Sequence, residues 1–243
     1  MYIYLPIAEQ PINAFIVLGI GWLVGIIMGM VGIGGGFLLT PLMIFFGIPS
    51  PVAVASVANQ LVAPSVSGVL SHWKSGNVDF KMGTILLVGG VIGSSIGVLI
   101  FNILNAIGQL DLVIKLSYVI FLAVIGSLMF IESLKLIVQT KRGKPTRGKL
   151  HQHNWLHGLP FKTRFRKSKL YISIILPLII GVIVGILAAL MGIGGGFIIV
   201  PAMIYLLGMP TSLVIGTSLF QIIFVAANTT ILQASQNQTV DII

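Results

Sequence analysis

Apolar residues run along the chain in eight segments, separated by short polar or glycine-rich interruptions. Windows of about 20 apolar residues are long enough to cross about 30 Å of hydrocarbon as helices. Glycine and proline inside such helices are tolerated, because neighbouring membrane helices can satisfy the freed backbone groups. The pattern predicts helices at 11–31, 35–47, 52–71, 82–103, 112–138, 171–191, 195–207 and 212–233.

Composition supports a membrane protein. Hydrophobic residues make up 56% of the 243 residues, and charged residues make up only 8%. A soluble domain carries roughly 25% charged residues, so this chain cannot cover itself with polar surface in water. Cysteine is absent, which excludes disulfides, thiolate catalysis and cysteine metal sites. The fold class expected is therefore an all-α polytopic membrane protein.

Positive charge is concentrated in one segment. Ten of the fourteen Lys and Arg residues lie between Lys141 and Lys169, between two apolar blocks. Such loops face the cytoplasm, so we expect 139–170 to be cytoplasmic and the amino terminus to lie outside. A charge confined to a loop indicates topology rather than nucleic acid. The loop is a solvated segment that sets the topology or, alternatively, a segment that contacts anionic membrane lipids.

One glycine cluster occurs twice. The sequence GIGGGF stands at 32–37 and again at 192–197, 160 residues apart, with a proline four residues after each. The match predicts a duplicated unit whose helices break at the same place, which is the best sequence indicator of a transporter's binding site. If 35–47 crosses the membrane, five crossings precede the basic loop and the second unit is inverted. If 35–47 is re-entrant, the count changes.

The chain divides into a first transmembrane repeat at 1–138, a basic cytoplasmic loop at 139–170 and a second transmembrane repeat at 171–243. Val78-Asp79 matches Val240-Asp241, but the first repeat continues for two more helices that the second repeat lacks. This difference, roughly 60 residues, favours a truncated second repeat. A duplication that was always partial, and a second subunit that supplies the pair, are the alternatives. A homo-oligomer is compatible with the sequence.

Glycines four residues apart also invite close helix packing. They stand on three of the predicted helices, as Gly21, Gly25 and Gly29, as Gly93 and Gly97, and as Gly181 and Gly185.

Candidate substrate-binding residues lie at the two breaks and on the helix that follows each. Glycine lets backbone approach a ligand closely, and a helix that restarts after a break presents free N–H groups and a dipole that favour an anion. The candidates are Gly34, Gly35, Gly36, Ser56, Asn59, Gln60, Gly194, Gly195, Gly196, Thr217, Ser218 and Gln221. The alternative is that the glycines only permit tight helix crossing and the polar side chains only join helices.

No residue pattern indicates an enzyme. Paired carboxylates, a Ser/His/Asp arrangement and a Walker loop are all missing, so no catalytic residues and no cofactor are expected. The histidines at 151, 153 and 157 resemble a loose metal tract, but the neighbouring cations oppose metal binding, and no metal is expected.

The chain resembles the TauE/SafE family of sulfite and organosulfonate exporters. The resemblance lies in the two GIGGGF clusters with their prolines, in GTSLFQ at 216–221 and in GNVD at 76–79. It implies a bacterial inner-membrane permease for small sulfur-containing anions such as sulfite, thiosulfate or organosulfonates. Inverted repeats imply alternating access. An anion channel and a non-transporting scaffold or sensor subunit are the alternatives.

Overall fold

The computed structural model describes residues 2–31, 35–141 and 161–241. All predicted helices are present, and their ends lie within four residues of the predicted ones. The helices are α1 Ala14–Val31, α2 Gly36–Phe45, α3 Ser50–Lys74, α4 Phe80–Ala106, α5 Leu110–Lys141, α6 Ile175–Met191, α7 Gly196–Pro201, the π-helix η2 Ala202–Leu206 and α8 Thr211–Gln236.

Two short antiparallel hairpins were not predicted. One pairs β1 (Tyr2–Leu5) with β2 (Gln10–Asn13), and the other pairs β3 (Lys162–Phe165) with β4 (Leu170–Ser173). Their registers match with the 160-residue offset of the glycine clusters, and each hairpin directly precedes the first helix of its half. The repeated structure therefore includes the end of the segment that the sequence predicts as a loop.

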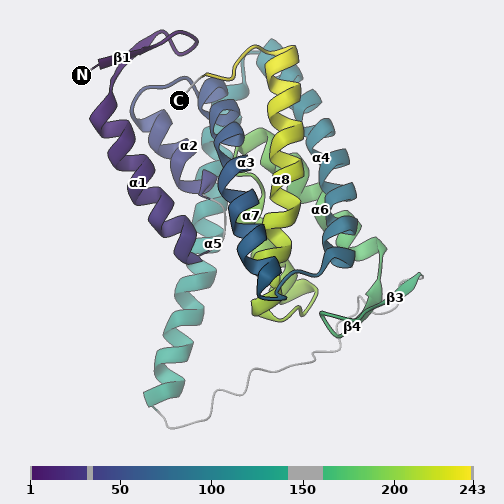
Figure 1. Cartoon of the computed structure of the whole chain (residues 1–243). Helices are drawn as coiled ribbons and strands as arrows, with labels where there is room; N and C mark the ends of the chain where they lie inside the picture. Colours follow the sequence, from purple (N-terminus) through teal and green to yellow (C-terminus); the bar gives the residue numbers. More distant parts are fainter. Residues whose placement is uncertain (1, 32–34, 142–160, 242–243) are drawn as a thin grey trace.

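The two halves run in opposite directions. The β1–β2 hairpin lies at one end of the helix bundle and β3–β4 at the other, and α3 and α8 each run away from the hairpin of their own half (Figure 1). Residues of each hairpin share a hydrophobic cluster with residues that follow the short helix of the same half. Leu5 clusters with Ile48, and Phe165 clusters with Met209. The predicted inverted repeats are confirmed.

The short helices α2 and α7 do not cross the membrane. A methyl group on Gly36 would lie 2.7 Å from the carbonyl oxygen of Gly192, so the two breaks touch. In inverted repeats, breaks at opposite surfaces would be about 30 Å apart. Both breaks are therefore tips of re-entrant helix pairs that enter from opposite ends. Of the two possibilities that the sequence leaves open for 35–47, the contact of the breaks favours the re-entrant one. The sequence alone does not decide between them, because apolar residues indicate a lipid-like environment without indicating depth.

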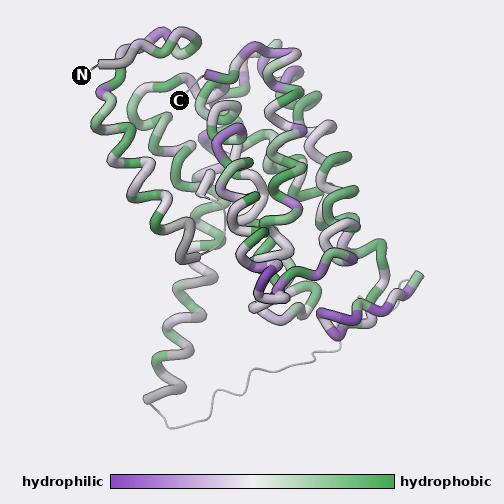
Figure 2. Tube along the Cα trace, viewed as in Figure 1, coloured by the Kyte–Doolittle hydropathy of each residue, from purple (hydrophilic) through white to green (hydrophobic). Residues whose placement is uncertain are grey.

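Four described segments are long and apolar enough to cross a membrane: α3, α4, Leu110–Ser127 of α5, and α8. Three of them precede the basic segment, which is still an odd number, so the inversion of the second half is retained. Figure 2 shows hydrophobic residues along these helices and hydrophilic ones gathered at the bundle ends and on β3–β4.

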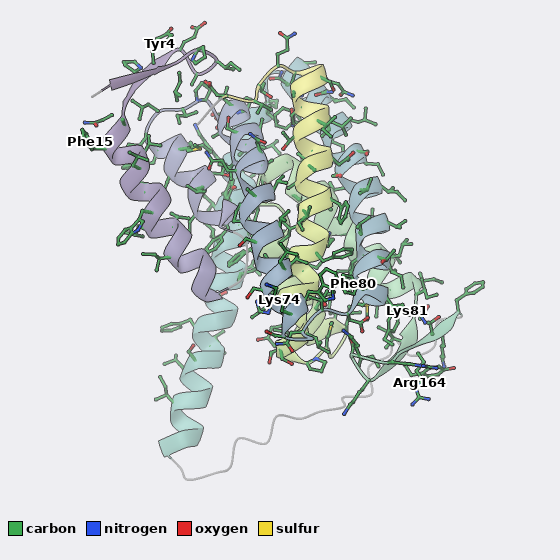
Figure 3. The ribbon with its side chains drawn as sticks, in the orientation of Figure 1. Tyr4, Phe15, Lys74, Phe80, Lys81 and Arg164 are labelled. Atoms are coloured by element: carbon green, nitrogen blue, oxygen red, sulfur yellow. The ribbon has the colours of Figure 1, made fainter. Side chains whose placement is uncertain are left out.

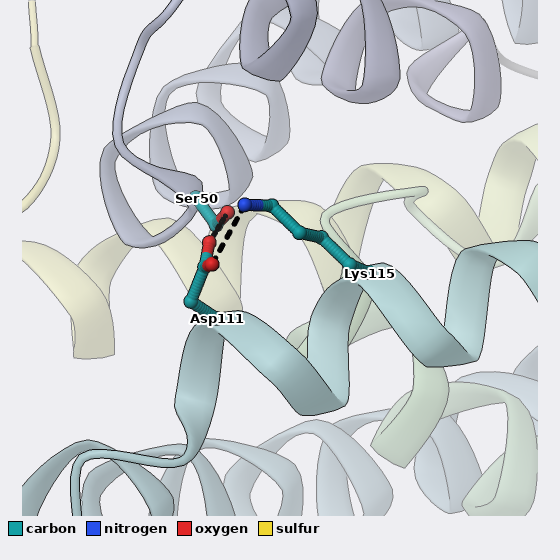
Figure 4. Close-up of polar contacts among 3 residues, drawn as sticks. All are labelled: Ser50, Asp111 and Lys115. Atoms are coloured by element: carbon teal, nitrogen blue, oxygen red, sulfur yellow. Dashed lines mark hydrogen bonds and ion pairs between the residues drawn. The ribbon is translucent and has the colours of Figure 1, made fainter.

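Polar side chains fasten the start of α5 to the start of α3. The hydroxyl of Ser50 donates to one carboxylate oxygen of Asp111, and Lys115 lies 2.7 Å from the other (Figure 4). Both members of the ion pair are half exposed, and such surface pairs contribute at most about 1 kcal/mol. The contact therefore positions α5 without adding much stability.

Glycine contacts between α4 and α6 form the tightest helix crossing. A methyl group on Gly93 would lie 2.1 Å from the carbonyl oxygen of Val182, and one on Gly185 would lie 2.3 Å from that of Gly90. The predicted close packing at these glycines is confirmed.

The matching face of α1 has no such partner. Gly21 and Gly25 correspond to Gly181 and Gly185, yet a methyl group on either would meet no described atom within 4 Å. The side chain of Trp22 on the same helix is 73% exposed. In the structure, α4 of the first half packs against the glycine face of α6. Among the described residues of the second half, no helix packs in the corresponding way against α1.

Candidate substrate site at the two helix breaks

The tips of the two re-entrant helix pairs, one from each repeat, contact each other. Phe37 and Phe197 follow the two glycine clusters, and their rings stack with centroids 4.2 Å apart and planes 10° from parallel. Gly36 contacts the backbone of Gly192 and Ile193 beside this stack. The two glycine clusters, 160 residues apart in sequence, therefore form one continuous structure.

Backbone geometry explains the glycines of the second break. Gly192, Gly194 and Gly195 have positive φ angles of 70°, 69° and 79°. Side chains disfavour this left-handed region, whereas glycine adopts it readily. Gly192 ends α6 by donating its N–H to the carbonyl of Ala188, and Gly195 begins α7.

At the first break, Gly35 and Gly36 are buried at the start of α2, and Gly34 lies outside the described residues. The carbonyl of Gly35 accepts the first helical hydrogen bonds of α2, and that of Gly195 does the same for α7. The N–H groups of the two residues after each of these glycines are left without intrahelical partners. Two helix starts thus bring free donors, and the positive ends of their dipoles, to one place.

Gln221 is the most unusual polar side chain of the bundle. It is fully buried, and neither amide atom has a hydrogen-bond partner among the described residues. Its Nε2 would lie 2.6 Å from a methyl group on Gly90. Gly90 also contacts Gly185, whose neighbour Val184 contacts Gly195. A buried amide without partners costs about 1–3 kcal/mol, so Gln221 is a candidate partner for a polar ligand.

The matched amide of Gln60 has different surroundings. Gln60 is half buried and lines a cavity of about 430 Å³ between α1, α2 and α3. The rest of the lining is apolar and includes Leu39 and Met43. In the second half, α4 closes the corresponding space over Gln221. The two glutamines match in sequence but are not equivalent in the structure.

Three of the four remaining predicted side chains form hydrogen bonds elsewhere. Ser56 accepts the backbone N–H of Asp241, and Thr217 accepts that of Asp79, both at 3.0 Å. The hydroxyl of Ser218 donates to the carbonyl of Ile215 within its own helix, and Asn59 is exposed. The structure therefore brings glycine backbone to the break, and substrate binding by these four side chains stays a prediction.

The sequence analysis missed one residue at the second break. Tyr118 on α5 is buried, and its hydroxyl donates to the carbonyl of Met191, the last residue of α6. Thr40 of α2, which is fully buried, lies beside the same hydroxyl. A tyrosine in an apolar helix carries no sequence signal for such a contact.

Inverted repeats whose broken helices meet inside a membrane bundle have the architecture of a secondary transporter. Comparison with known proteins identifies the family. The model of the sulfite exporter TauE/SafE family matches residues 17–243. The chain belongs to this family, and it is a membrane transporter rather than an enzyme.

Similar proteins come from bacteria and an archaeon. The probable membrane transporter protein YjnA of Bacillus subtilis is 30% identical over 88% of this chain and 77% of its own length. A probable membrane transporter protein of Xylella fastidiosa is 28% identical over 86% of this chain and 70% of its own. The probable membrane transporter protein MJ0441 of Methanocaldococcus jannaschii is 30% identical over 75% and 58%. No solved structure matches the chain.

Proposed function

We propose that the chain carries small sulfur-containing oxyanions, such as sulfite, thiosulfate or organosulfonates, across the bacterial inner membrane by alternating access. The observation that carries the proposal is the meeting of two glycine helix starts, from inverted repeats, at one place. Backbone N–H groups at helix starts are ready-made anion sites. The family description, which names sulfite, supports the substrate class.

The donors at this place suit a compact anion that must also be released. They are backbone N–H groups and the amide of Gln221, and all are neutral. Among the described residues, the buried side chains include no lysine or arginine. Neutral donors bind an oxyanion without the strong attraction of a fixed cation, so turnover is not prevented by tight binding.

Gly36 and Gly192 touch in this structure, so an anion between them requires the two tips to separate. Rocking of one repeat against the other provides this movement. The described cations Lys74, Lys81 and Arg164 lie at the end with β3–β4 (Figure 3). By the rule that positive loops stay inside, this end faces the cytoplasm and the β1–β2 hairpin faces outside.

A thermal-shift panel tests the proposal. The purified chain is heated with sulfite, thiosulfate, sulfoacetate, taurine, sulfate or chloride at matched ionic strength. A ligand that binds only the folded form adds about 2.7 kcal/mol to the free energy of unfolding when its concentration is about a hundred times its Kd. We expect saturable stabilisation by a sulfur oxyanion and none by chloride, together with saturable flux of that anion into proteoliposomes.

The same assays separate the alternatives. Flux that does not saturate would favour an anion channel, and stabilisation without any flux would favour a scaffold or sensor. If none of the sulfur anions stabilises the chain or crosses the membrane, the proposed function is wrong.

Replacement of Gln221 by leucine separates a binding role from a structural one. Removing a buried amide that has no partner is expected to raise the free energy of unfolding by about 1–3 kcal/mol, while weakening anion binding. Thermal unfolding with and without the anion measures both effects. The matched control is Gln60→Leu, where the amide faces the open cavity. A less stable Gln221→Leu chain with normal anion binding would contradict the assignment.

A further inference from the structure

Two buried aspartates each hold the hairpin of the opposite repeat. Asp79 follows α3 of the first repeat and is 3% exposed, and Asp241 follows α8 of the second and is 2% exposed. Neither carboxylate is at the helix breaks. Both accept hydrogen bonds from the turn that joins the two strands of a hairpin, and in each case the hairpin belongs to the other half.

The contact of Asp79 closes the end of the bundle at β3–β4. Its Oδ2 accepts the N–H of Ser168 at 3.1 Å and the hydroxyl of Ser168 at 2.5 Å. Its Oδ1 accepts the N–H of Met82 and so caps α4. Beside it, the ammonium of Lys167 donates to the carbonyl of Val78 at 3.1 Å. Ser168 is 1% exposed, so these bonds form away from water.

The contact of Asp241 repeats this arrangement at the other end. Its Oδ2 accepts the N–H groups of Ile7 and Ala8 at 3.0 and 3.1 Å. Its own N–H donates to Ser56, as that of Asp79 donates to Thr217. Ala8 stands where the second repeat has Ser168, with the 160-residue offset of the two hairpins. Each Oδ2 thus accepts two hydrogen bonds from the opposite hairpin: one N–H and one hydroxyl at Asp79, and two N–H groups at Asp241.

Each contact joins the two repeats at one face only, because the hairpins lie at opposite ends of the bundle (Figure 1). A movement that separates the repeats at one face must break the carboxylate contact there and can leave the other intact. Hydrogen bonds to a carboxylate are roughly twice as strong as neutral ones, and a buried carboxylate that loses its donors is costly. Both contacts are formed in this structure.

We propose that Asp79 and Asp241 are a pair of gating residues, one for each face, whose contacts are released in turn during alternating access. The inference rests on the proposed function for its role in transport.

Accessibility of single cysteines tests the gates, because the chain has no cysteine of its own. The reporters are Val57→Cys and Ser218→Cys, which are fully buried and stand directly after the hydroxyl acceptors Ser56 and Thr217. A membrane-impermeant maleimide is applied from each side of vesicles that contain the full chain. Labelling needs no substrate, so its result is independent of which anion is carried.

Asp79→Asn retains the helix cap, since asparagine caps as well as aspartate, but it removes the charge that holds Ser168. We expect labelling at Ser218→Cys to rise about tenfold and labelling at Val57→Cys to fall. A tenfold change is the effect expected when a charge-assisted hydrogen bond is replaced by a neutral one. Asp241→Asn is expected to do the reverse. A purely structural role would raise labelling at both reporters or change neither, and either result overturns the gates.

An exchange of the two natural residues provides a milder test that does not depend on folding of the aspartate variants. Ser168→Ala removes one of the two hydrogen bonds that Asp79 Oδ2 accepts from the hairpin, and should shift labelling in the direction of Asp79→Asn. Ala8→Ser should lower labelling at Val57→Cys. Asp111→Asn is the control, because the polar partners described for Asp111, Ser50 and Lys115, belong to its own half, and it should shift neither reporter.

The outcome is distinguishable from failure of the proposed function. Opposite shifts at the two reporters support the gates even if no sulfur anion is carried. Transport of a sulfur anion without such shifts overturns the gates and leaves the proposed function in place.

Discussion

Valine at Gly36 or at Gly195 is expected to slow anion transport in proteoliposomes by up to about a hundredfold. A side chain on Gly36 meets the Gly192 carbonyl oxygen at 2.7 Å. One on Gly195 requires a φ of 79° and meets Val184 at 2.6 Å. Overpacking of this kind costs up to about 3 kcal/mol, equivalent to about a hundredfold in rate or affinity. Initial rates of sulfite or thiosulfate flux measure the loss, and gel filtration in detergent checks that each variant is monodisperse.

Gly126→Val is the matched control for these variants. Gly126 lies in α5, is exposed, and has no described atom within 4 Å of an added methyl group. Its replacement should leave the rate unchanged. If valine at both Gly36 and Gly195 also left it unchanged, the meeting of the breaks would have no part in transport.

Alanine at Gly185 and alanine at Gly25 should have opposite effects on stability, although the two positions match between the repeats. At Gly185 the methyl group would lie 2.3 Å from the backbone oxygen of Gly90, so α4 and α6 must move apart. We expect a loss of about 1–3 kcal/mol, or failure to fold. At Gly25 the space is open, and the better helix propensity of alanine should add up to about 1 kcal/mol.

Thermal unfolding of the two variants in the same detergent measures this difference. The pair controls for the substitution itself, because both replace a glycine inside an apolar helix by alanine. Equal effects at the two positions would contradict the close crossing of α4 and α6, or the open face of α1.

Helix positions could be predicted from the sequence, because long apolar segments have few alternatives in a membrane. The depth to which a segment enters the membrane could not be predicted, since 35–47 is apolar whether it crosses or turns back. The hairpins were missed for a related reason. Residues 162–169 are rich in lysine and arginine and read as a solvated loop, although Phe165 and Ser168 are buried against the bundle.

The candidate site was predicted unevenly. The glycine breaks were found because their duplication is visible in the sequence, and their meeting follows from inversion. Hydroxyls such as those of Ser56 and Thr217 were assigned to the substrate because nothing in the sequence shows their partners. Those partners are backbone N–H groups of Asp241 and Asp79. The matched aspartates were visible as landmarks of the repeat, but their role depends on which hairpin lies beside each of them.

The stacked rings of Phe37 and Phe197 come from matched positions, so they lie on the axis that relates the repeats. The stack can therefore serve as the pivot point when one repeat rotates against the other. Atoms near the pivot point hardly move. Displacement grows with distance from this point and has opposite signs at the two ends of the bundle. A small rotation can therefore keep the rings in contact while it widens the bundle at one face and narrows it at the other. One rigid movement of this kind would expose the centre of the bundle to a single side at a time.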